Sequence, residues 1–415
     1  MIRLVIIADD FTGALDTGVK LSESGIRTLV TTKLAEDVSA YDTDVLVVDT
    51  ESRHLSPEEA YEAVFSVAKR FADQPDVLVF KKTDSGLRGN IGAELTAAMR
   101  GLGEEKLAFV PGYPAIGRIT RGGVHYIDGK PVAESVFGID LLNPVRFSRV
   151  DEIILDQSDE VVVSRSIKDL SASAWGISVY DAESEDEMHK IILSLKKQGV
   201  RLMAGCAGAG AYLPEILTVP EAERPIPDLE EPLFAICGSI NPVTVSQVDW
   251  ARTHGFEHFR LRPKQKLDVT FWETPDGQQM LQTFKALILE KKPVVVDAMD
   301  NGENQETVRV GKAMGLSVDE IRRRISRMLA ALFGELFAAD NAGTLMIIGG
   351  DTLQECMTKI GIHEMEPVSE MSQGVVLARF SRGGKQKYIL TKSGGFGEES
   401  LLTDLSEQIK KVEGK

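Results

Sequence analysis

Two adjacent carboxylates follow the first apolar run of the chain and lie beside a glycine. The segment is Ala8-Asp9-Asp10-Phe11-Thr12-Gly13, and the run before it is Leu4–Ile7. Such carboxylates could orient a substrate hydroxyl, accept its proton or hold a magnesium ion. The alternative use is structural, because Asp10 or Thr12 could cap a following helix, and for this segment alone capping is the more common use.

A second polar segment, Lys81–Asn90, begins where another apolar run ends. It places lysines, a carboxylate and hydroxyls ahead of a predicted helix, whose N-terminus favours anions. This composition suits a polyhydroxylated carboxylate. The structural alternative is an Asp84–Arg88 pair across one helical turn, which on a surface would contribute only ~0.3–0.5 kcal/mol. Arg53, which follows the strand ending at Asp49, could reach the same anion with two of its nitrogens.

The second half of the chain carries three glycine turns after apolar runs. They are Gly238-Ser239-Ile240-Asn241, Gly349-Gly350-Asp351-Thr352 and Lys392-Ser393-Gly394-Gly395-Phe396-Gly397. Glycine lets successive backbone N–H groups approach a phosphate. One such turn would be explained by tight-turn geometry alone, whereas three indicate a phosphate-binding region. No P-loop sequence is present, and no Gly-x-Gly-x-x-Gly follows the first strand, which disfavours an NAD-dependent oxidoreductase.

Alternating apolar runs and amphipathic stretches predict the elements that position these residues. The expected strands are Leu4–Ala8, Val45–Val48, Val77–Phe80, Leu107–Val110, Gly176–Val179, Arg201–Ala204, Leu233–Cys237, Pro293–Asp297, Thr344–Ile348, Gly374–Phe380 and Gln386–Leu390. Helices such as Gly13–Ser24 and Glu185–Lys197 are expected between strands. This order predicts an α/β fold with mostly parallel, helix-covered sheets, in which ligands bind at the carboxyl ends of the strands. Residues 111–150 break the alternation around an Asp128-Gly129 hairpin turn, and so long an irregular stretch is usually functional.

The length of 415 residues predicts two domains. The proline-rich stretch Leu217–Pro232 is interpreted as the linker, which divides the chain into residues 1–228 and 229–415. We expect the active-site cleft to lie between the two domains.

The net charge and the lengths of the apolar runs disfavour two classes of protein. A net charge of −16 disfavours a nucleic-acid partner, and no apolar run approaches the ~18 residues of a membrane span. The chain begins directly with a strand and without a signal pattern, so a cytoplasmic protein is expected. A homodimer is the commonest state of such enzymes.

Three scattered cysteines are expected to be buried and reduced. Arg322, Arg323, Arg324 and Arg327 have helical spacing and are expected to form a solvated face.

These segments, in this order, resemble the four-carbon acid sugar kinase family. The matching stretches are Ile7–Ala14 with Asp16, Lys82–Asn90, Pro111–Pro114 with Gly117-Arg118, Gly123–Tyr126, Gly238-Ser239, Gly349–Thr352 and Ser393–Gly397. They span nearly the whole chain, and jointly they are specific. The resemblance implies an N-terminal domain that binds the sugar acid and a C-terminal domain that binds ATP, with phosphorylation of the terminal hydroxyl of a tetronate.

The resemblance also implies residue roles. Asp9, Thr12, Arg53, Lys82, Thr83, Ser85 and Arg88 would bind the sugar acid. Ser239, Gly349, Gly350, Asp351, Thr352, Gly394 and Gly395 would contact the nucleotide. Asp10 or Asp84 would accept the hydroxyl proton, and Asp351 would help to hold Mg²⁺. The two domains would close over both ligands and expel water.

The substrate is expected to be D-threonate or D-erythronate, because the segment ending in Leu87-Arg88 is more similar to those kinases than to the 3-oxotetronate kinases, which are the alternative. Two departures from the family pattern are Gly86, where Thr is more usual, and the bulky Leu353-Gln354-Glu355. A rival of another class is a non-catalytic sugar-acid sensor, which would explain the polar loops of the first half but not the three glycine turns of the second.

Overall fold

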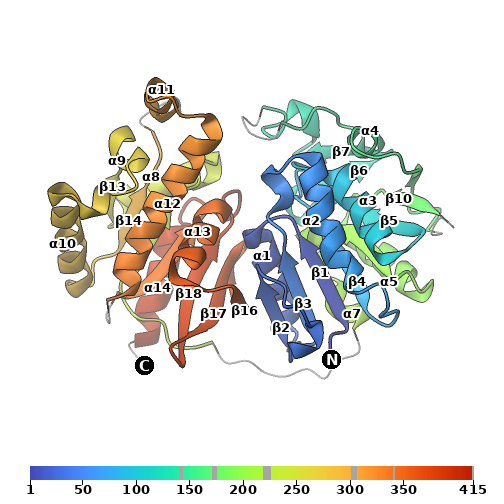
Figure 1. The fold of residues 1–415 in the computed structure, drawn as a ribbon, viewed down its shortest axis with the longest axis horizontal. Helices are drawn as coiled ribbons and strands as arrows, with labels where there is room; N and C mark the ends of the chain where they lie inside the picture. Colours follow the sequence, from blue (N-terminus) through green and yellow to red (C-terminus); the bar gives the residue numbers. More distant parts are fainter. Residues whose placement is uncertain (140–143, 171–174, 218–225, 301–305, 340–341, 414–415) are drawn as a thin grey trace. The chain divides into compact units, whose positions relative to one another are not determined.

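The computed structural model describes residues 1–139, 144–170, 175–217, 226–300, 306–339 and 342–413. The chain divides into two compact units, Met1–Glu223 and Arg224–Lys415 (Figure 1). Each unit has a mostly parallel sheet covered by helices, so the predicted two-domain α/β fold is confirmed. Residues 218–225 of the predicted linker lie outside the described residues.

The sheet of the first unit is entirely parallel, with strand order β2-β3-β1-β4-β11-β5-β10-β9. Its strands are β1 (Leu4–Ala8), β2 (Thr28–Thr31), β3 (Val45–Asp49), β4 (Leu78–Lys82), β5 (Lys106–Val110), β9 (Val162–Arg165), β10 (Gly176–Tyr180) and β11 (Leu202–Gly205). All residues of β1 and β3 are buried, which explains why these strands read as continuous apolar runs in the sequence.

Helices cover both faces of this sheet (Figure 1). Helix α2 (Pro57–Lys69) packs on α3 (Ile91–Leu102), and α3 packs on α4 (Val150–Leu155). A second group comprises α1 (Phe11–Glu23), α5 (Glu185–Lys197), α6 (Ala207–Gly210) and α7 (Leu213–Ile216). Right-handed crossovers place the two groups on opposite faces. Helix α1 begins at Phe11, earlier than the predicted Gly13, because the carboxylate of Asp10 caps it.

The irregular segment after β5 folds into a small antiparallel sheet. Its strands are β6 (Arg118–Arg121), β7 (Val124–Ile127) and β8 (Lys130–Pro131). The predicted hairpin turn at Asp128-Gly129 joins β7 to β8 and is confirmed, and both turn residues have positive φ.

The second unit has strand order β13-β14-β12-β15-β18-β17-β16, with parallel pairing from β13 to β18 and antiparallel pairing beyond. The strands are β12 (Leu233–Cys237), β13 (Glu257–Arg260), β14 (Val294–Asp297), β15 (Thr344–Ile348), β16 (Glu364–Ser372), β17 (Val375–Arg382) and β18 (Lys385–Lys392). The main helices are α8 (Pro242–Thr253), α10 (Pro275–Leu289), α12 (Val318–Phe337), α13 (Gly350–Ile360) and α14 (Leu401–Glu413).

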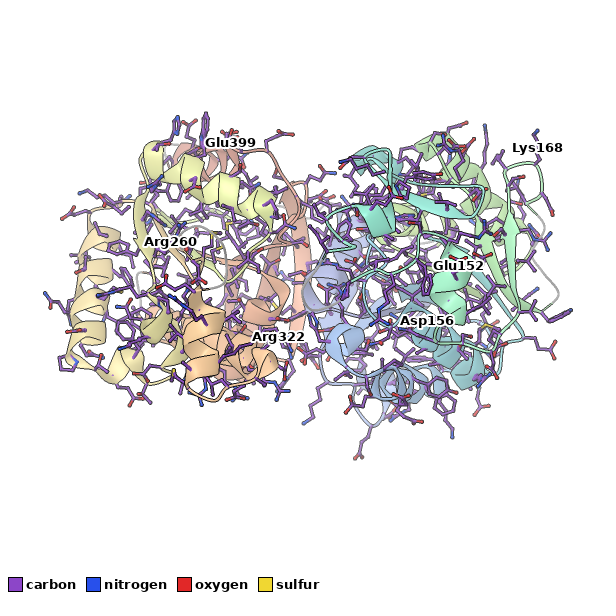
Figure 2. The ribbon with its side chains drawn as sticks, turned by 90° about the horizontal axis from the view of Figure 1, so that it is seen from above. Glu152, Asp156, Lys168, Arg260, Arg322 and Glu399 are labelled. Atoms are coloured by element: carbon purple, nitrogen blue, oxygen red, sulfur yellow. The ribbon has the colours of Figure 1, made fainter. Side chains whose placement is uncertain are left out.

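The expected solvated face of α12 is only partly confirmed. Arg323 and Arg327 are exposed, with 54% and 55% of their side chains accessible. Arg322, labelled in Figure 2, is instead only 24% exposed, because its guanidinium pairs with Asp319 and with Asp351 at the start of α13. Cys206, Cys237 and Cys356 are buried free thiols, as expected.

Candidate active site

Polar loops follow three neighbouring strands of the first unit at one edge of its sheet. Ala8 of β1 pairs with Asp49 of β3 and with Lys82 of β4, so the three strands end level. The loops that follow carry Asp9, Asp10, Arg53 and segment 83–90, all predicted to be functional. The structure therefore brings together the first half's candidate residues at the edge where parallel sheets bind ligands.

Arg53 is held by the two adjacent aspartates. Its Nε donates to Asp9 Oδ2 at 2.7 Å, and its Nη2 donates to Asp10 Oδ1 at 2.6 Å. The same Nη2 lies 3.8 Å from Asp84 Oδ1. Burial alone would lower the pKa of Arg53, but Asp10, Asp9 and Asp84 raise it well above its usual value. Arg53 is therefore a fixed cation shared by three carboxylates.

Asp10 is both a helix cap and a member of this cluster. Its Oδ1 accepts a hydrogen bond from the Gly13 N–H at 3.2 Å, and its Oδ2 accepts one from the Thr12 hydroxyl at 2.6 Å. Burial would raise the pKa of Asp10, but Arg53 and Lys82 lower it to about 2. The structural and the chemical use of this segment thus coincide.

Gly13 lies where no side chain fits. A Cβ at this position would be 2.4 Å from Asp10 Oδ1 and 2.5 Å from Lys82 Nζ. The carboxylate and the ammonium group therefore both lie against the first turn of α1, and a larger residue would displace them.

Asp84 organises the turn after β4. Its Oδ2 accepts hydrogen bonds from the backbone N–H groups of Gly86 at 3.0 Å and Arg88 at 3.2 Å, and its carboxylate also accepts from Arg88 Nε at 3.0 Å and Nη2 at 2.9 Å. Burial would raise the pKa of Asp84, but Arg88 and Arg53 bring it well below its usual value. The side chain of Asp84 is 8% exposed, so the small energy of a surface ion pair does not apply.

Two buried oxygens of the site have no hydrogen-bond partner among the described residues. They are Asp9 Oδ1 and Thr83 Oγ1. Leaving such a group unsatisfied costs about 1–3 kcal/mol, which a hydrogen bond to a ligand would offset. Because Arg53 occupies the other oxygen of Asp9, the pair fits a ligand that carries hydroxyl groups.

Sequence reasoning assigned no role to three residues that the segment after β5 brings to this site, although Arg118 and His125 lie in stretches that match the family. Arg118 donates from Nη1 to the Ser85 hydroxyl, and the guanidinium carbon of Arg118 lies 5.1 Å from the centre of the Phe137 ring. His125 Nε2 lies 3.0 Å from the Ser85 carbonyl oxygen. Burial lowers the pKa of His125 to about 4, so the ring is neutral near pH 7 and donates from Nε2. The irregularity of this segment indicated a function but did not select these side chains.

A buried ion pair beneath the site was also missed. Lys81 Nζ lies 2.8 Å from Glu94 Oε2, and both side chains are at most 1% exposed. The Ser52 hydroxyl donates to Glu94 Oε1 at 2.6 Å, and Asn90 Nδ2 donates to the Ser52 carbonyl at 2.9 Å. Glu94 and Asn90 both bond to Ser52 and therefore fix the short turn that carries Arg53.

The three glycine turns of the second unit also meet at one sheet edge. Cys237 pairs with Ile348, and Ile348 pairs with Lys392, so β12, β15 and β18 end level. A Cβ on Gly394 would lie 2.5 Å from the Ser239 hydroxyl, and one on Gly238 would lie 1.9 Å from the Thr352 hydroxyl. The predicted nucleotide residues of these turns therefore lie in contact.

The N-terminus of helix α13 lies among these glycine turns. Its N-cap, Gly349, has φ 114° and no side chain to bond to the first N–H groups, and Gly350 is the first helical residue. Gly395 lies in the turn after β18, and Thr352 lies in the first turn of α13. An uncapped helix N-terminus beside glycine turns is suited to bind phosphate.

The side chain of Lys392 holds the third glycine turn, Ser393–Gly397, through hydrogen bonds to its backbone. Its Nζ donates to the carbonyl oxygens of Ser393 at 3.0 Å and Gly394 at 3.3 Å, and to the Thr244 hydroxyl at 3.3 Å. The side chain is fully buried, and this burial lowers its pKa to about 8. Lys392 therefore sets the position of the turn that contacts Ser239.

We expect Lys392→Met to raise the KM for ATP about 10- to 100-fold, since hydrogen bonds to a charged group contribute about 1.5–3 kcal/mol. The KM for the acceptor should change little. In the wild type, the KM for ATP should also rise as the pH passes about 8, where Lys392 loses its proton, and this rise should be absent from the variant. Lys385→Met, on an exposed residue of the same strand, is the control. An equal change in both KM values would contradict this role.

Asp351 is the one carboxylate predicted to hold magnesium. Its Oδ2 accepts a hydrogen bond from Arg322 Nη1 at 2.8 Å, and its side chain is 40% exposed. The described residues contain no group of three His, Cys, Asp or Glu side chains that could hold a metal ion. Mg²⁺ in phosphoryl-transfer sites is held largely by substrate phosphates and water, with one or two carboxylates. Asp351 fits such a supporting role but not that of a complete protein site.

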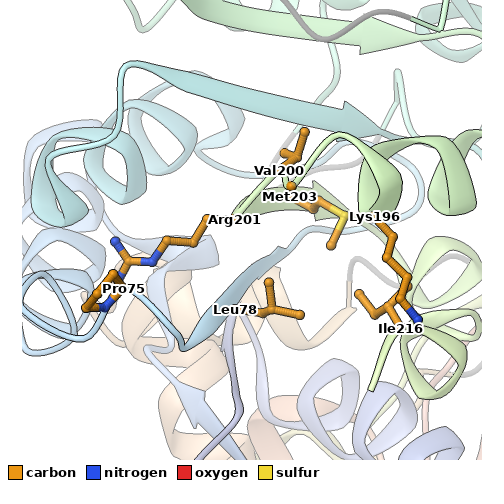
Figure 3. A pocket seen from close by; sticks show the side chains of 8 residues that line it. Pro75, Leu78, Lys196, Val200, Arg201, Met203 and Ile216 are labelled. Atoms are coloured by element: carbon orange, nitrogen blue, oxygen red, sulfur yellow. The ribbon is translucent and has the colours of Figure 1, made fainter. Parts of the chain in front are cut away.

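The cavity drawn in Figure 3 is separate from these groups. It is lined by residues at the amino ends of β4 and β11, including Leu78, Arg201 and Met203. The guanidinium of Arg201 donates to the carbonyl oxygens of Phe71, Gln74 and Val77. Arg201 therefore lies at the amino ends of β4 and β11, whereas the candidate site lies at the carboxyl ends of the strands.

Comparison with known families agrees with this division of the chain. A model described as a sugar-binding N-terminal domain matches residues 4–213, and one described as a nucleotide-binding C-terminal domain matches residues 234–402. The chain belongs to the four-carbon acid sugar kinase family. The expected enzyme class, a sugar-acid kinase, is thereby confirmed, and family membership implies ATP as a substrate.

Curated relatives of the family cover nearly the whole chain. A D-threonate kinase of Salmonella typhimurium is 28% identical over 97% of both chains. A D-erythronate kinase of Heliobacterium modesticaldum is 27% identical over 98% of this chain and 99% of its own. Relatives at 23–25% identity are 3-oxo-tetronate kinases.

A solved structure from Salmonella typhimurium, described as a candidate tRNA synthase, has a TM-score of 0.77 at 19% identity and covers 98% of this chain and 100% of that chain. This likeness shows a shared fold alone. No described helix combines the length and apolar composition that crossing a membrane requires.

Proposed function

We propose that this member of the family transfers the γ-phosphoryl group of ATP to the terminal (4-) hydroxyl of D-threonate or D-erythronate. The observation that carries the proposal is the Asp9–Arg53–Asp10 cluster with the two unpartnered oxygens of Asp9 and Thr83. It offers hydroxyl recognition beside fixed cations, which is what a polyhydroxylated carboxylate requires. The names of the relatives at 27–28% identity support the same substrates.

The N-terminal domain, which we place at residues 1–228, would hold the sugar acid. Arg88 and Lys82 would neutralise its carboxylate, and Asp9, Thr83 and Ser85 would bond to its hydroxyls. Thr12 would act through Asp10, to which it donates. Arg53 would fix Asp9 and Asp10 so that their oxygens keep one orientation in each turnover.

In the transfer step, the 4-hydroxyl oxygen bonds to the γ-phosphorus while the bond from that phosphorus to the β–γ bridging oxygen breaks and ADP leaves. The hydroxyl proton would pass to Asp10 or Asp84. Both carboxyls have pKa values below their usual range, so they are ionised at neutral pH and can accept it. A weak base is sufficient, because the transition state of phosphoryl transfer is loose and requires little activation of the attacking oxygen.

The C-terminal domain, which we place at residues 229–415, would bind ATP. The Ser239 hydroxyl, the N–H groups of Gly350–Thr352 at the start of α13, and the turn at Gly394 and Gly395 would bond to its phosphates. Mg²⁺ would be carried by the phosphates with help from Asp351, and it would neutralise charge on the transferring group.

The proposal is tested by measuring ADP release with ATP and each four-carbon sugar acid in a coupled assay. We expect turnover with D-threonate or D-erythronate at a higher kcat/KM than with 3-oxotetronate. Mass spectrometry of the product should place the phosphate on the terminal oxygen. The reverse order of kcat/KM would assign this chain to the 3-oxotetronate kinases instead. Tight binding of a sugar acid without any ADP release would favour the sensor alternative.

A further inference from the structure

The aromatic ring of Phe137 makes three contacts at the candidate site, two with the turn after β4 and one with Arg118 of β6. Phe137 follows the small antiparallel sheet and is only 7% exposed. The guanidinium carbons of Arg88 and Arg118 each lie 5.1 Å from the centre of this ring. The third contact is with Gly86, which lies between Ser85 and Arg88 in the turn. One side chain therefore touches both arginines that border the proposed acid site.

Gly86 leaves the space that the ring occupies. A Cβ on Gly86 would lie 2.8 Å from three atoms of the Phe137 ring, closer than carbon atoms approach one another. The Gly86 N–H donates to Asp84 at 3.0 Å, and Leu87 has a positive φ of 59°, so the backbone of the turn cannot easily move away. The Phe137 ring therefore fits in its place only because residue 86 is a glycine.

The ring also helps to hold two like charges together. Arg88 is oriented by Asp84, and Arg118 is oriented by the Ser85 hydroxyl. Both guanidinium groups contact the Phe137 ring, and both also interact electrostatically with the Asp84 carboxylate. An aromatic face attracts a guanidinium through the quadrupole of the ring. Burial lowers the pKa of Arg118, because it removes the guanidinium from part of its water. Two guanidinium groups therefore lie on one ring, and the Arg88 side chain keeps 27% of its surface exposed, so the pair can meet an anion.

We propose that Phe137 is a positioning residue that holds Arg88 and Arg118 for the carboxylate of the sugar acid, and that Gly86 is required to admit its ring. The inference rests on the proposed function, since it assigns the anionic end of the same substrate. It makes the pair Gly86 and Phe137 a determinant of affinity for acids over neutral polyols.

The test compares Phe137→Leu with Phe137→Tyr. Leucine retains an apolar group but removes the ring face, and we expect the KM for the sugar acid to rise about 5- to 30-fold, with kcat and the KM for ATP within about twofold. Tyrosine retains the face and should restore a KM near that of the wild type. Phe71→Leu is the matched control, because Phe71 is also buried in the same unit but lies beside Arg201 at the other end of the sheet.

Gly86→Ala provides an independent test. Its methyl group should displace the ring and give the same rise in the KM for the acid. In the Phe137→Leu background the added effect of Gly86→Ala should be much smaller, because the ring that it displaces is already gone. Full additivity of the two substitutions would contradict the coupling that we propose.

The outcomes separate this inference from the proposed function. If the wild type forms no ADP with any four-carbon acid, the proposed function fails before the variants are compared. If the wild type is active and Phe137→Leu changes the KM for the acid no more than Phe71→Leu does, the inference about Phe137 fails alone. Equal losses in Phe137→Leu and Phe137→Tyr would also overturn it, because a ring face would then have no role.

Discussion

Replacing Arg53 by methionine should abolish turnover and destabilise the first unit by about 3–5 kcal/mol at neutral pH. Arg53 donates to Asp9 and Asp10 and lies 3.8 Å from Asp84, and its side chain is only 12% exposed. Methionine fills a similar volume but leaves three carboxylates without their shared cation. The cost is large because an uncompensated buried charge is more expensive than the pair is favourable.

The loss of stability should depend on pH with a defined sign. The pKa of Asp10 is about 2 in the folded protein, below its reference value of 3.8. A carboxyl with a lowered folded pKa stabilises the fold above its unfolded pKa, and this contribution is lost as the pH falls through the folded value. Arg53 is the leading cause that lowers this pKa. The difference between the wild type and Arg53→Met should therefore be largest at neutral pH and shrink below pH 3.8.

Urea unfolding at neutral pH, and at the lowest pH where the wild type stays folded, measures this difference. Arg100→Met is the control, since Arg100 pairs with Asp159 and Glu160 on the surface and is 45% exposed. Exposed pairs contribute about 1 kcal/mol or less. A loss for Arg53→Met as small as that of the control, or a loss that does not change with pH, would show that the cluster is not organised around Arg53.

The sequence was sufficient to predict that the candidate residues of the first unit lie together, because each of them follows the carboxyl end of a strand. Apolar runs locate β1, β3 and β4, and the rule for parallel sheets brings together whatever follows them. Asp9, Asp10, Arg53 and Asp84 all follow such runs, and the structure places them in one cluster. The sequence did not show that Arg53 would bond to Asp9 and Asp10, because its guanidinium could have paired equally well with another anion within reach.

The partners that come from elsewhere in the chain could not be predicted. Phe137 and Arg118 lie in an irregular segment, where no periodicity fixes which side chains face the turn after β4. Glu94 reads as an ordinary polar residue of a helix, yet it is buried against Lys81. Strands such as β2 and β9 were also missed, because each is four residues long and has partly exposed positions. In each case the deciding contact is between residues distant in the sequence.

Asp84→Asn should lower kcat about 10²- to 10⁴-fold while the KM for ATP changes less than about threefold, if Asp84 accepts the hydroxyl proton. Asparagine retains the size of the side chain but cannot accept a proton at neutral pH. It also replaces one of the two oxygens that bond to Arg88 and to the backbone of the turn. Steady-state kinetics with both substrates measures the change, and a nearly intact kcat would exclude this role.

A second variant separates proton transfer from the ordering of the turn. Arg88→Met breaks the same ion pair but leaves the carboxylate of Asp84 in place, still bonded to the Gly86 N–H. If Asp84 acts chiefly by holding Arg88, the two variants should lose kcat equally, because each removes the same contact. If Asp84 is the base, Arg88→Met should mainly raise the KM for the sugar acid, and only Asp84→Asn should remove the chemical step. Asp10→Asn should then retain most of kcat, since the two carboxylates cannot both be the proton acceptor.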